Sequence, residues 1–506
     1  MKFLAYDLGT GGVKASLYDE GLNTLAKSVI DYETYYPEHN FHEQRPEDWW
    51  RGVIKSTRQL LAEAKVSPQE IRCVALSGHS CVAVPLDEQG RSLVEYVPIW
   101  SDTRAAEQAK RFFEQVDGDL WYMTTGNGFP APCYCLFKLM WYKQHMPRMF
   151  GQIRQVVGSK DYINLRLTGK IAIDHSYASG TGAYDLKQGK MCEDFFEAAG
   201  IPSSFFPEIV PSHSIVGYVT EEAAREIGLA PGTAVACGGV DNACMALGAV
   251  GPQSGQVYAS LGSSSWIPVN SRDPILDAVK RPYVFAHIQE GMFTSAFSIF
   301  AGGSSLRWAK ENLCSEWGED AYVKIEELAA NSAVGANGIL FNPSLAGGTS
   351  QDKSVNIRGG FVGLNLGSTR ADMLRAVLEG VALNLRCSLE YLKQKARLTD
   401  QILFCGGGSQ MRLWMQIFAD VFGMDIIKTN IEQDAASVGA AAICARAVGH
   451  WPDYEKVLSL HRIVDRFTPD AACHAKYEPV YRAFNRASEL LSDLGDFVST
   501  GKEIEG

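Results

Sequence analysis

The chain has 506 residues and a formal net charge of −11, and hydrophobic residues make up 46% of it. At roughly 100–200 residues per domain, this length predicts two to four domains, and the composition argues against wholesale disorder. Because no long Lys/Arg block offsets the acidic balance, nucleic acid and anionic membranes are disfavoured as partners.

The composition also bears on the cellular compartment. No apolar run reaches the ~18 residues that a membrane-spanning helix needs. Met1 and Lys2 lead directly into an apolar strand rather than a secretory signal. The 12 cysteines are scattered without a CxxC pair, which favours free thiols over disulfides or a zinc site. We therefore expect a cytoplasmic protein.

The first thirty residues predict a β-meander with strands over Lys2–Tyr6, Val13–Tyr18 and Leu22–Ile30. The first turn has the composition of an anion site, because Gly11 and Gly12 free backbone N–H groups and Thr10 adds a hydroxyl. Lys14 could add positive charge, and Asp7 could hold hydrated Mg²⁺ beside the anion. For this turn alone, an ordinary glycine-rich hairpin is an equal alternative.

Two polar loops follow predicted strands in the first half. A buried strand over Ile71–Leu76 runs into Gly78, His79, Ser80 and Cys81, and a second loop carries Trp100 and Asp102. Strands of an α/β sheet that end in polar side chains mark the edge where ligands bind. The apolar face of Trp100 and the acceptor of Asp102 suit a polyol. A purely structural role for His79 is an equal alternative.

A glycine-rich segment then delivers one carboxylate. Short strands over 216–219 and 233–236 lead to Gly238 and Gly239, which Asp241 and Asn242 follow closely. Glycine lets the backbone approach a bound molecule. An Asp in such a place can accept a proton from a hydroxyl. Taken alone, the Asp-Asn pair fits an Asx turn or a helix cap better.

After Asp241 the chain repeats its opening pattern. A strand over Gly255–Leu261, the turn residues Gly262 and Ser263, and a strand over Trp266–Val269 follow one another. Two such turns could grip one polyphosphate from opposite sides. We place the domain boundary near 248–255, which divides the chain into domains 1–250 and 251–506.

A third glycine cluster lies in the second half. The strand Gln401–Cys405 ends in Gly406, Gly407 and Gly408, and a helix follows to about Phe422. This arrangement brings backbone close to a flat or charged ligand at a helix N-terminus, and an adenosine moiety would fit. Gly359–Leu364 is predicted to be a turn. Further helices are predicted over 46–65, 138–145, 159–167, 191–199, 371–392 and 477–491, and another from Ala435.

Together these motifs resemble the FGGY carbohydrate kinases, within the actin/hexokinase-like ATPase superfamily, over nearly the whole chain. Gly359–Leu364, with Asp372-Met373 and Ala376–Glu379, fits the family's C-terminal signature at every constrained position. The opening turn is similar to the family's first phosphate loop, and Gly262-Ser263 falls at the second. Gly303 falls at another nucleotide contact, and Gly239–Asn242 matches the segment that carries the catalytic Asp.

The resemblance implies an α/β fold in which two RNase H-like domains flank a central cleft. It also implies ATP-dependent phosphorylation of a hydroxyl on a small sugar or polyol, with ATP and Mg²⁺ bound. Asp241 is then the general base, and Asp7 orients the metal. The expected substrate-binding residues are His79, Ser80, Cys81, Trp100, Asp102 and Asn242. The expected nucleotide-binding residues are Thr10, Gly11, Gly12, Lys14, Gly262, Ser263, Gly303, Gly406, Gly407 and Gly408.

The substrate and the oligomeric state stay open, and a homodimer is one possibility. Xylulokinases are most similar in loop pattern and length, but residues 78–81 read Gly-His-Ser-Cys in place of their usual Gly-Gln-Met-His. A sugar-sensing pseudokinase is an alternative, and Asp7, Thr10 and Asp241 argue against it. An actin- or chaperone-like ATPase that acts on protein partners is another, and the FGGY signature argues against that.

Overall fold

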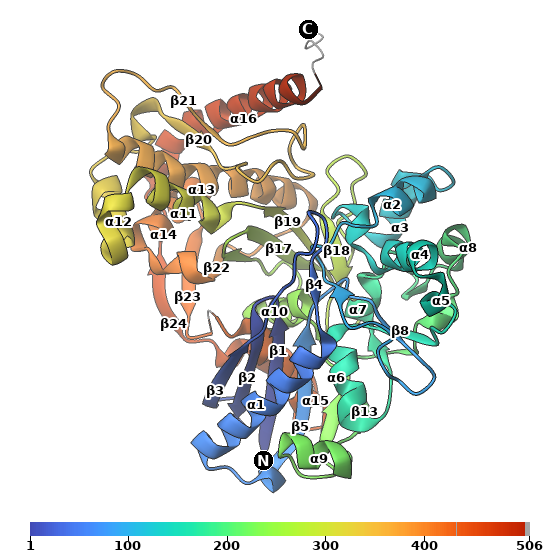
Figure 1. The fold of residues 1–506 in the computed structure, drawn as a ribbon. Helices are drawn as coiled ribbons and strands as arrows, with labels where there is room; N and C mark the ends of the chain where they lie inside the picture. The colour runs from blue at the N-terminus through green and yellow to red at the C-terminus, as the bar shows by residue number, and fades with distance from the viewer. Residues whose placement is uncertain (432, 501–506) are drawn as a thin grey trace.

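The computed structural model describes residues 1–431 and 433–500, which form an α/β structure with two seven-stranded sheets (Figure 1). The first sheet has the order β13-β14-β5-β1-β2-β3, and β15 pairs with β5 off this path. Its strands are β1 (Lys2–Gly9), β2 (Gly12–Tyr18), β3 (Thr24–Asp31), β5 (Ile71–Gly78), β13 (Ile215–Tyr218), β14 (Ala234–Ala236) and β15 (Gly239–Val240).

The second sheet has the order β18-β19-β17-β16-β22-β23-β24. Its strands are β16 (Tyr258–Leu261), β17 (Ser265–Ser271), β18 (Tyr283–Ala286), β19 (Phe293–Ile299), β22 (Gln401–Cys405), β23 (Asp425–Thr429) and β24 (Ile463–Phe467). Five short two-stranded ladders lie outside the two sheets. They pair β4 (Glu43–Gln44) with β7 (Val97–Pro98), β6 (Val84–Leu86) with β8 (Gln155–Val157), β9 (Ile173–Asp174) with β12 (Ile209–Val210), β10 (Tyr184–Asp185) with β11 (Lys190–Met191), and β20 (Leu340–Asn342) with β21 (Gly360–Val362).

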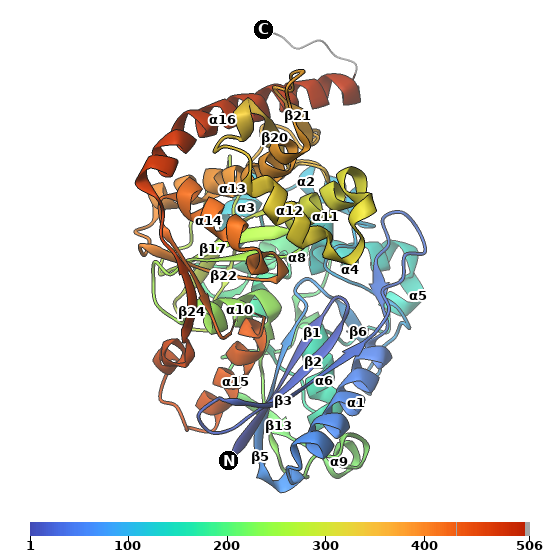
Figure 2. The ribbon, with the colours of Figure 1, turned by 90° about the vertical axis from the view of Figure 1, so that its left-hand side faces the viewer.

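The two sheets share one plan. In the first, β1 pairs antiparallel with β2 and parallel with β5. In the second, β16 pairs antiparallel with β17 and parallel with β22. The next strand outward is also parallel in both sheets, since β14 is parallel to β5 and β23 is parallel to β22. The predicted repeat of strand, turn and strand is therefore confirmed, and the two halves stand one above the other in Figure 2.

The main helices of the first half are α1 (Pro46–Ala64), α2 (Ala106–Phe113), α3 (Gly118–Thr125), α4 (Cys135–His145), α6 (Ser159–Thr168), α7 (His175–Ser179), α8 (Glu193–Ala199), α9 (Glu221–Ile227) and α10 (Asp241–Val250). Those of the second half are α11 (Gly302–Leu313), α12 (Ala321–Ala330), α13 (Arg370–Lys395), α14 (Arg412–Phe422), α15 (Ala435–Ala447) and α16 (Ala471–Thr500). None of the described helices combines the length and the apolar composition that crossing a membrane requires.

Helix α1 follows from its sequence. Pro46 opens the first turn, where proline loses no hydrogen bond, and two acidic residues there face the positive end of the helix dipole. Trp49, Val53 and Leu60 recur at helical spacing and are buried against the sheet. Lys65 ends the helix in a left-handed conformation, so the prediction over 46–65 is confirmed to within one residue.

Several predicted boundaries were wrong, for local reasons. The first turn is shorter than expected, because Leu8 pairs with Val13 and Gly9 with Gly12. The predicted turn at Gly359–Leu364 contains β21, which pairs with β20. The terminal helix α16 extends well beyond the predicted 477–491 at both ends. Residues 241–250, for which no helix was expected, form α10.

Two helices from distant parts of the chain pack against each other and against the first sheet. Helix α15 follows the second sheet's β23 in sequence, yet it packs against β1 and β5 of the first (Figure 1). It also packs against α10, where glycines allow the backbones to touch. A Cβ on Gly248 would lie 1.8 Å from the Ala435 carbonyl oxygen, and one on Gly439 would lie 2.1 Å from that of Cys244. These contacts, in the middle and at the C-terminal end of α10, tie the two halves of the chain together.

We expect Gly439→Ala to separate α10 from α15 and to lower the free energy of unfolding by about 1–3 kcal/mol, the usual cost of overpacking. Chemical denaturation measures the change. Gly360→Ala is the matched control, because a Cβ there meets nothing within 4 Å. If both variants keep wild-type stability, the helix contact is looser than described.

Candidate active site

Two carboxylates come together where strands of the first sheet end. Asp7 lies near the end of β1 and pairs in parallel register with Ser77 of β5. The Ser77 hydroxyl donates to Asp7 Oδ1 at 2.8 Å. Strand β15 also pairs with the end of β5, which delivers Asp241 to the same edge. The sequence did not point to Ser77, although it lies at the end of a predicted strand.

Asp241 is the first residue of α10, directly after β15. Its Oδ1 accepts the backbone N–H of Asn242 at 2.8 Å. Burial raises the pKa of Asp241 to about 7, and the nearby charge of Asp7 adds to the rise. A carboxyl group with this pKa is poised to accept a proton near neutral pH.

Asn242 joins the two halves of the molecule. Its Oδ1 accepts a hydrogen bond from the Ser80 hydroxyl at 3.3 Å, and its Nδ2 donates to the Tyr283 hydroxyl at 3.2 Å. Tyr283 begins β18 of the second sheet. Tyr283 was not predicted as a site residue, because no local motif in the sequence marks it. The site is thus completed by a side chain from the other half of the chain.

Hydrogen bonds and ring packing fix the loop at 78–81. The backbone N–H of His79 donates to the Ser159 hydroxyl at 3.0 Å, and the His79 ring packs edge-on against Trp49. Burial lowers the pKa of His79 to about 4, so the ring is neutral. Cys81 has a φ of 58°, and its carbonyl oxygen accepts a hydrogen bond from Lys138 Nζ at 2.7 Å. Its thiol is buried, which raises the pKa of Cys81.

In the second loop predicted to bind the sugar, which carries Trp100 and Asp102, one of these side chains is exposed and the other is buried. Trp100 is 42% exposed, and its indole Nε1 donates to the Thr10 hydroxyl at 3.1 Å. Asp102 is fully buried and accepts hydrogen bonds from the His42 backbone N–H and the Arg104 guanidinium. The structure therefore brings Trp100 to the first predicted phosphate turn, whereas the Asp102 carboxylate faces the protein interior.

The first predicted phosphate turn is open at its tip and tight at its base. Thr10 and Gly11 are exposed, and a Cβ on Gly11 would meet nothing within 4 Å. A Cβ on Gly12 would lie 2.6 Å from the Ile30 carbonyl oxygen, so only glycine fits there. Lys14 Nζ donates to the Gln433 carbonyl oxygen at 2.7 Å. This contact ties the first hairpin to the segment before α15.

A cavity of about 600 Å³ lies in the second half. The Gly303 N–H donates to the Gly262 carbonyl oxygen at 2.8 Å, which joins the second hairpin turn to the start of α11. Gly406 has a φ of 95° and does not line the cavity. The wall is formed by Leu261, Gly262, Ser263, Gly303, Leu306, Arg307, Tyr322, Val323, Glu326, Gly407, Gly408, Gln410, Met411 and Trp414. Five predicted residues, from three separate segments of the chain, thus line one cavity.

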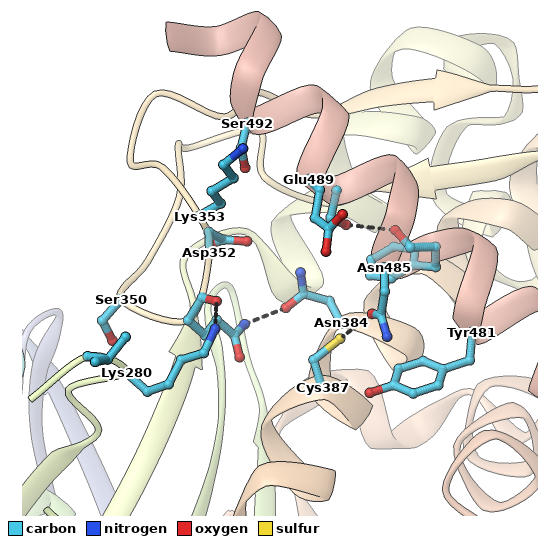
Figure 3. Close-up of a pocket in the computed structure, with 14 residues that line it drawn as sticks. Lys280, Ser350, Asp352, Lys353, Asn384, Cys387, Tyr481, Asn485, Glu489 and Ser492 are labelled. Carbon is cyan, nitrogen blue, oxygen red and sulfur yellow. Dashed lines mark hydrogen bonds between the residues drawn. The ribbon is translucent and has the colours of Figure 1, made fainter. Parts of the chain in front are cut away.

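Another cavity, of about 770 Å³, lies between α13 and α16 and is shown in Figure 3. Asn384 and Cys387 face it from α13, and Tyr481 and Asn485 face it from α16. None of the predicted site residues lines it. It is therefore separate from the candidate active site.

Models of the FGGY family of carbohydrate kinases match the chain twice, with the N-terminal domain over residues 2–248 and the C-terminal domain over residues 257–448. The xylulose kinase of Staphylococcus epidermidis is 30% identical over 497 residues, which are 97% of this chain and 98% of that one. The gluconokinase of Bacillus subtilis is 26% identical over 97% of this chain and 96% of its own length.

Solved structures agree with these matches. The crystal structure of xylulose kinase from Rhodospirillum rubrum superposes with a TM-score of 0.90 at 30% identity, covering 98% of this chain and 100% of that one. Plasmodium falciparum glycerol kinase with ADP gives a TM-score of 0.86 at 19% identity, over 96% of this chain and 98% of that one, and supports the fold alone. The two-domain, actin/hexokinase-like fold expected from the sequence is therefore confirmed. The chain belongs to the FGGY family of carbohydrate kinases and is an ATP-dependent sugar kinase.

Proposed function

We propose that the protein transfers the γ-phosphoryl group of ATP to a hydroxyl of a small, uncharged ketose or polyol, with Asp241 as the general base. The observation that carries this proposal is the position of Asp241. Its side chain is half-buried near Asp7, and the loss of solvent around the carboxylate raises its pKa to about 7. Its neighbour Asn242 contacts both halves of the molecule.

The sugar would lie against Asn242, Ser80 and Trp100. The amide and hydroxyl can exchange hydrogen bonds with sugar hydroxyls, and the exposed indole offers an apolar face to a sugar ring or chain. Tyr283 would approach from the second domain. These four side chains carry no charge, which favours a neutral sugar such as a ketose over a carboxylated one such as gluconate. The sugar would then not touch His79, Cys81 or Asp102. These residues would fix the loops that carry Ser80 and Trp100.

The nucleotide would occupy the second domain. Its adenosine moiety fits the cavity of about 600 Å³ between Gly407, Gly408 and Trp414. The phosphates would lie between the turns at 10–12 and 262–263, where backbone N–H groups can face an anion. Arg307, whose guanidinium donates to the Ser263 hydroxyl at 3.3 Å, would supply positive charge there.

We also propose a domain boundary between residues 250 and 251.

Asp7 suits a role in holding Mg²⁺. Burial raises the pKa of its carboxyl group, which indicates a site that gains from a bound cation. Among the described residues, no group of three or more His, Cys, Asp and Glu side chains could hold a metal ion unaided. Asp7 would therefore bind Mg²⁺ through water and together with the phosphates, as is usual for this ion. The metal would supply charge neutralisation at the phosphates.

In this arrangement Asp241 accepts the proton of the sugar hydroxyl as its oxygen attacks the γ-phosphorus. Asn242 fixes a neighbouring hydroxyl and thereby orients the attacking one. Such transfer depends mainly on positioning and charge neutralisation. The hydrogen bond between Asn242 and Tyr283 spans the two domains at 3.2 Å and would hold them together over the bound sugar. A site closed in this way would exclude water and limit ATP hydrolysis.

Asp241→Asn should lower turnover by about 10²–10⁴-fold, the usual worth of general-base help, and should largely spare the KM for ATP. ADP release across a panel of pentuloses, hexuloses, polyols and gluconate first identifies the preferred sugar, and the variant is then compared on it. Near-normal turnover of the variant on that sugar would exclude Asp241 as the base.

The pH profile gives an independent check. Because Asp241 must be ionised to accept a proton and its pKa is raised to about 7, kcat/KM for the sugar should rise with pH and level off above about 7. Below that point it should fall about tenfold per pH unit. The residual activity of Asp241→Asn should not show this fall below pH 7. A wild-type profile that is flat from pH 5 to 8 would contradict the assignment.

Gly407→Leu tests the nucleotide cavity. Gly407 lacks a positive φ, and a Cβ there meets nothing within 4 Å, so a leucine would project into the cavity without straining the backbone. The KM for ATP should rise at least about tenfold, or ~1.4 kcal/mol, while the KM for the sugar stays nearly constant. Gly360→Leu, also in open space, is the control. An unchanged KM for ATP would place adenosine elsewhere.

A further inference from the structure

The segment 237–240, which leads into Asp241, is held by buried groups that take no part in the chemistry above. At its start, the Cys237 carbonyl oxygen accepts hydrogen bonds from Asn164 Nδ2 at 2.9 Å and Lys160 Nζ at 3.3 Å. Both donors belong to α6. A buried ammonium therefore fixes the first residue of the glycine segment.

Lys160 is itself fixed by two buried carboxylates. Its Nζ lies 2.5 Å from Asp161 Oδ1 and 3.0 Å from Asp174 Oδ1. Burial alone would lower the pKa of Lys160, but the two carboxylates hold it well above its ordinary value. Burial would raise the pKa of Asp174, but Lys160 and the bond from Ser176 hold it below its ordinary value. Both groups are therefore charged at neutral pH.

Ser176 links Asp174 to Val240, at the other end of the segment 237–240. Its hydroxyl donates to Asp174 Oδ2 at 2.5 Å, because an ionised carboxylate can only accept. With its hydrogen committed in this way, the same oxygen accepts the backbone N–H of Val240 at 2.9 Å. Val240 directly precedes Asp241, so Asp174 sets the last backbone position before the proposed base through Ser176.

The middle of the segment has no room to shift. Gly238 has a φ of 77°, and a Cβ there would lie 2.2 Å from the Leu76 carbonyl oxygen. A Cβ on Gly239 would lie 2.3 Å from Ile288 Cδ1. Packing therefore confines the glycines between two hydrogen-bonded ends.

The same helix end also reaches the sugar loop. Ser159, which precedes Lys160, accepts the backbone N–H of His79 at 3.0 Å. A Cβ on Gly78 would lie 2.8 Å from the Ser159 hydroxyl oxygen. The first two residues of α6 thus hold both the loop proposed to carry the sugar and the segment proposed to carry the base.

We propose that Ser159, Lys160, Asp174 and Ser176 form a buried clamp that positions the Asp241 carboxylate against the sugar, with Ser176 as its positioning residue. The proposal rests on the function proposed above. Ser176 needs no contact with substrate for this role. It fixes the backbone from which Asp241 projects, and a displacement of about 1 Å at a reacting group can cost about 10²-fold in rate.

The chain offers a matched pair of serines for the test. Ser176 and Ser212 are both buried, and each hydroxyl donates to Asp174 Oδ2, Ser212 at 3.0 Å. Only the Ser176 hydroxyl also accepts the Val240 N–H. The bond of Ser212 to the glycine segment uses its backbone carbonyl oxygen, which a change to alanine preserves.

Ser176→Ala should lower kcat on the preferred sugar by about ten- to a hundredfold and leave both KM values within about threefold. Ser212→Ala should keep kcat within about threefold of wild type. Both variants should lose thermal stability, because each removes one hydrogen bond to Asp174, and Ser176→Ala should lose more because it also leaves the buried Val240 N–H without its acceptor. Steady-state kinetics and thermal denaturation on the full-length protein give these values.

Equal kcat losses in the two variants would overturn the clamp, as would a near-normal kcat for Ser176→Ala. If Ser176→Ala does not fold, Ser176→Cys replaces it, because its side chain is of similar size and its sulfur is a weaker acceptor. For this variant too we expect a lower kcat with both KM values nearly unchanged. A wild-type protein without sugar-dependent ADP release would instead refute the proposed function. The two failures are therefore distinguishable.

Discussion

The site depends on a carboxylate placed where its charge is unfavourable. Asp241 lies half-buried at the ends of the strands, close to Asp7, and both the loss of solvent around it and the neighbouring charge raise the pKa of Asp241 to about 7. The cost of this arrangement is offset only when a proton or a cation arrives. A sugar hydroxyl can supply the proton, and the Mg²⁺ that accompanies ATP would supply the positive charge. The same repulsion thus favours both steps of the proposed chemistry.

The fold keeps the two carboxylates together by joining distant parts of the chain. Asp7 comes from the first strand, and Asp241 from a helix that begins more than two hundred residues later. Helix α10 packs against α15, which in turn packs against β1 and β5. Glycine contacts at Gly248 and Gly439 leave little freedom at this crossing. The two halves of the chain therefore share one rigid support beneath the site.

Much of the fold was predictable because local patterns were strong. Gln401–Cys405 was predicted with the bounds of β22, since an apolar run followed by glycines has few alternatives. Helix α10 was missed because it is apolar and small on nearly all sides, as suits a helix buried between others. Tyr283 and the clamp around Lys160 were missed for another reason. Their roles arise from contacts between distant segments, which no local spacing records.

The central claim is that Asp241 accepts a proton from the sugar hydroxyl that attacks ATP. A crystal structure with a non-hydrolysable ATP analogue, Mg²⁺ and the preferred sugar tests it most directly. The account predicts one sugar hydroxyl within about 3 Å of an Asp241 carboxylate oxygen and in line with the terminal phosphorus. A sugar bound with its hydroxyls turned away from Asp241, or a terminal phosphate far from that carboxylate, would contradict it.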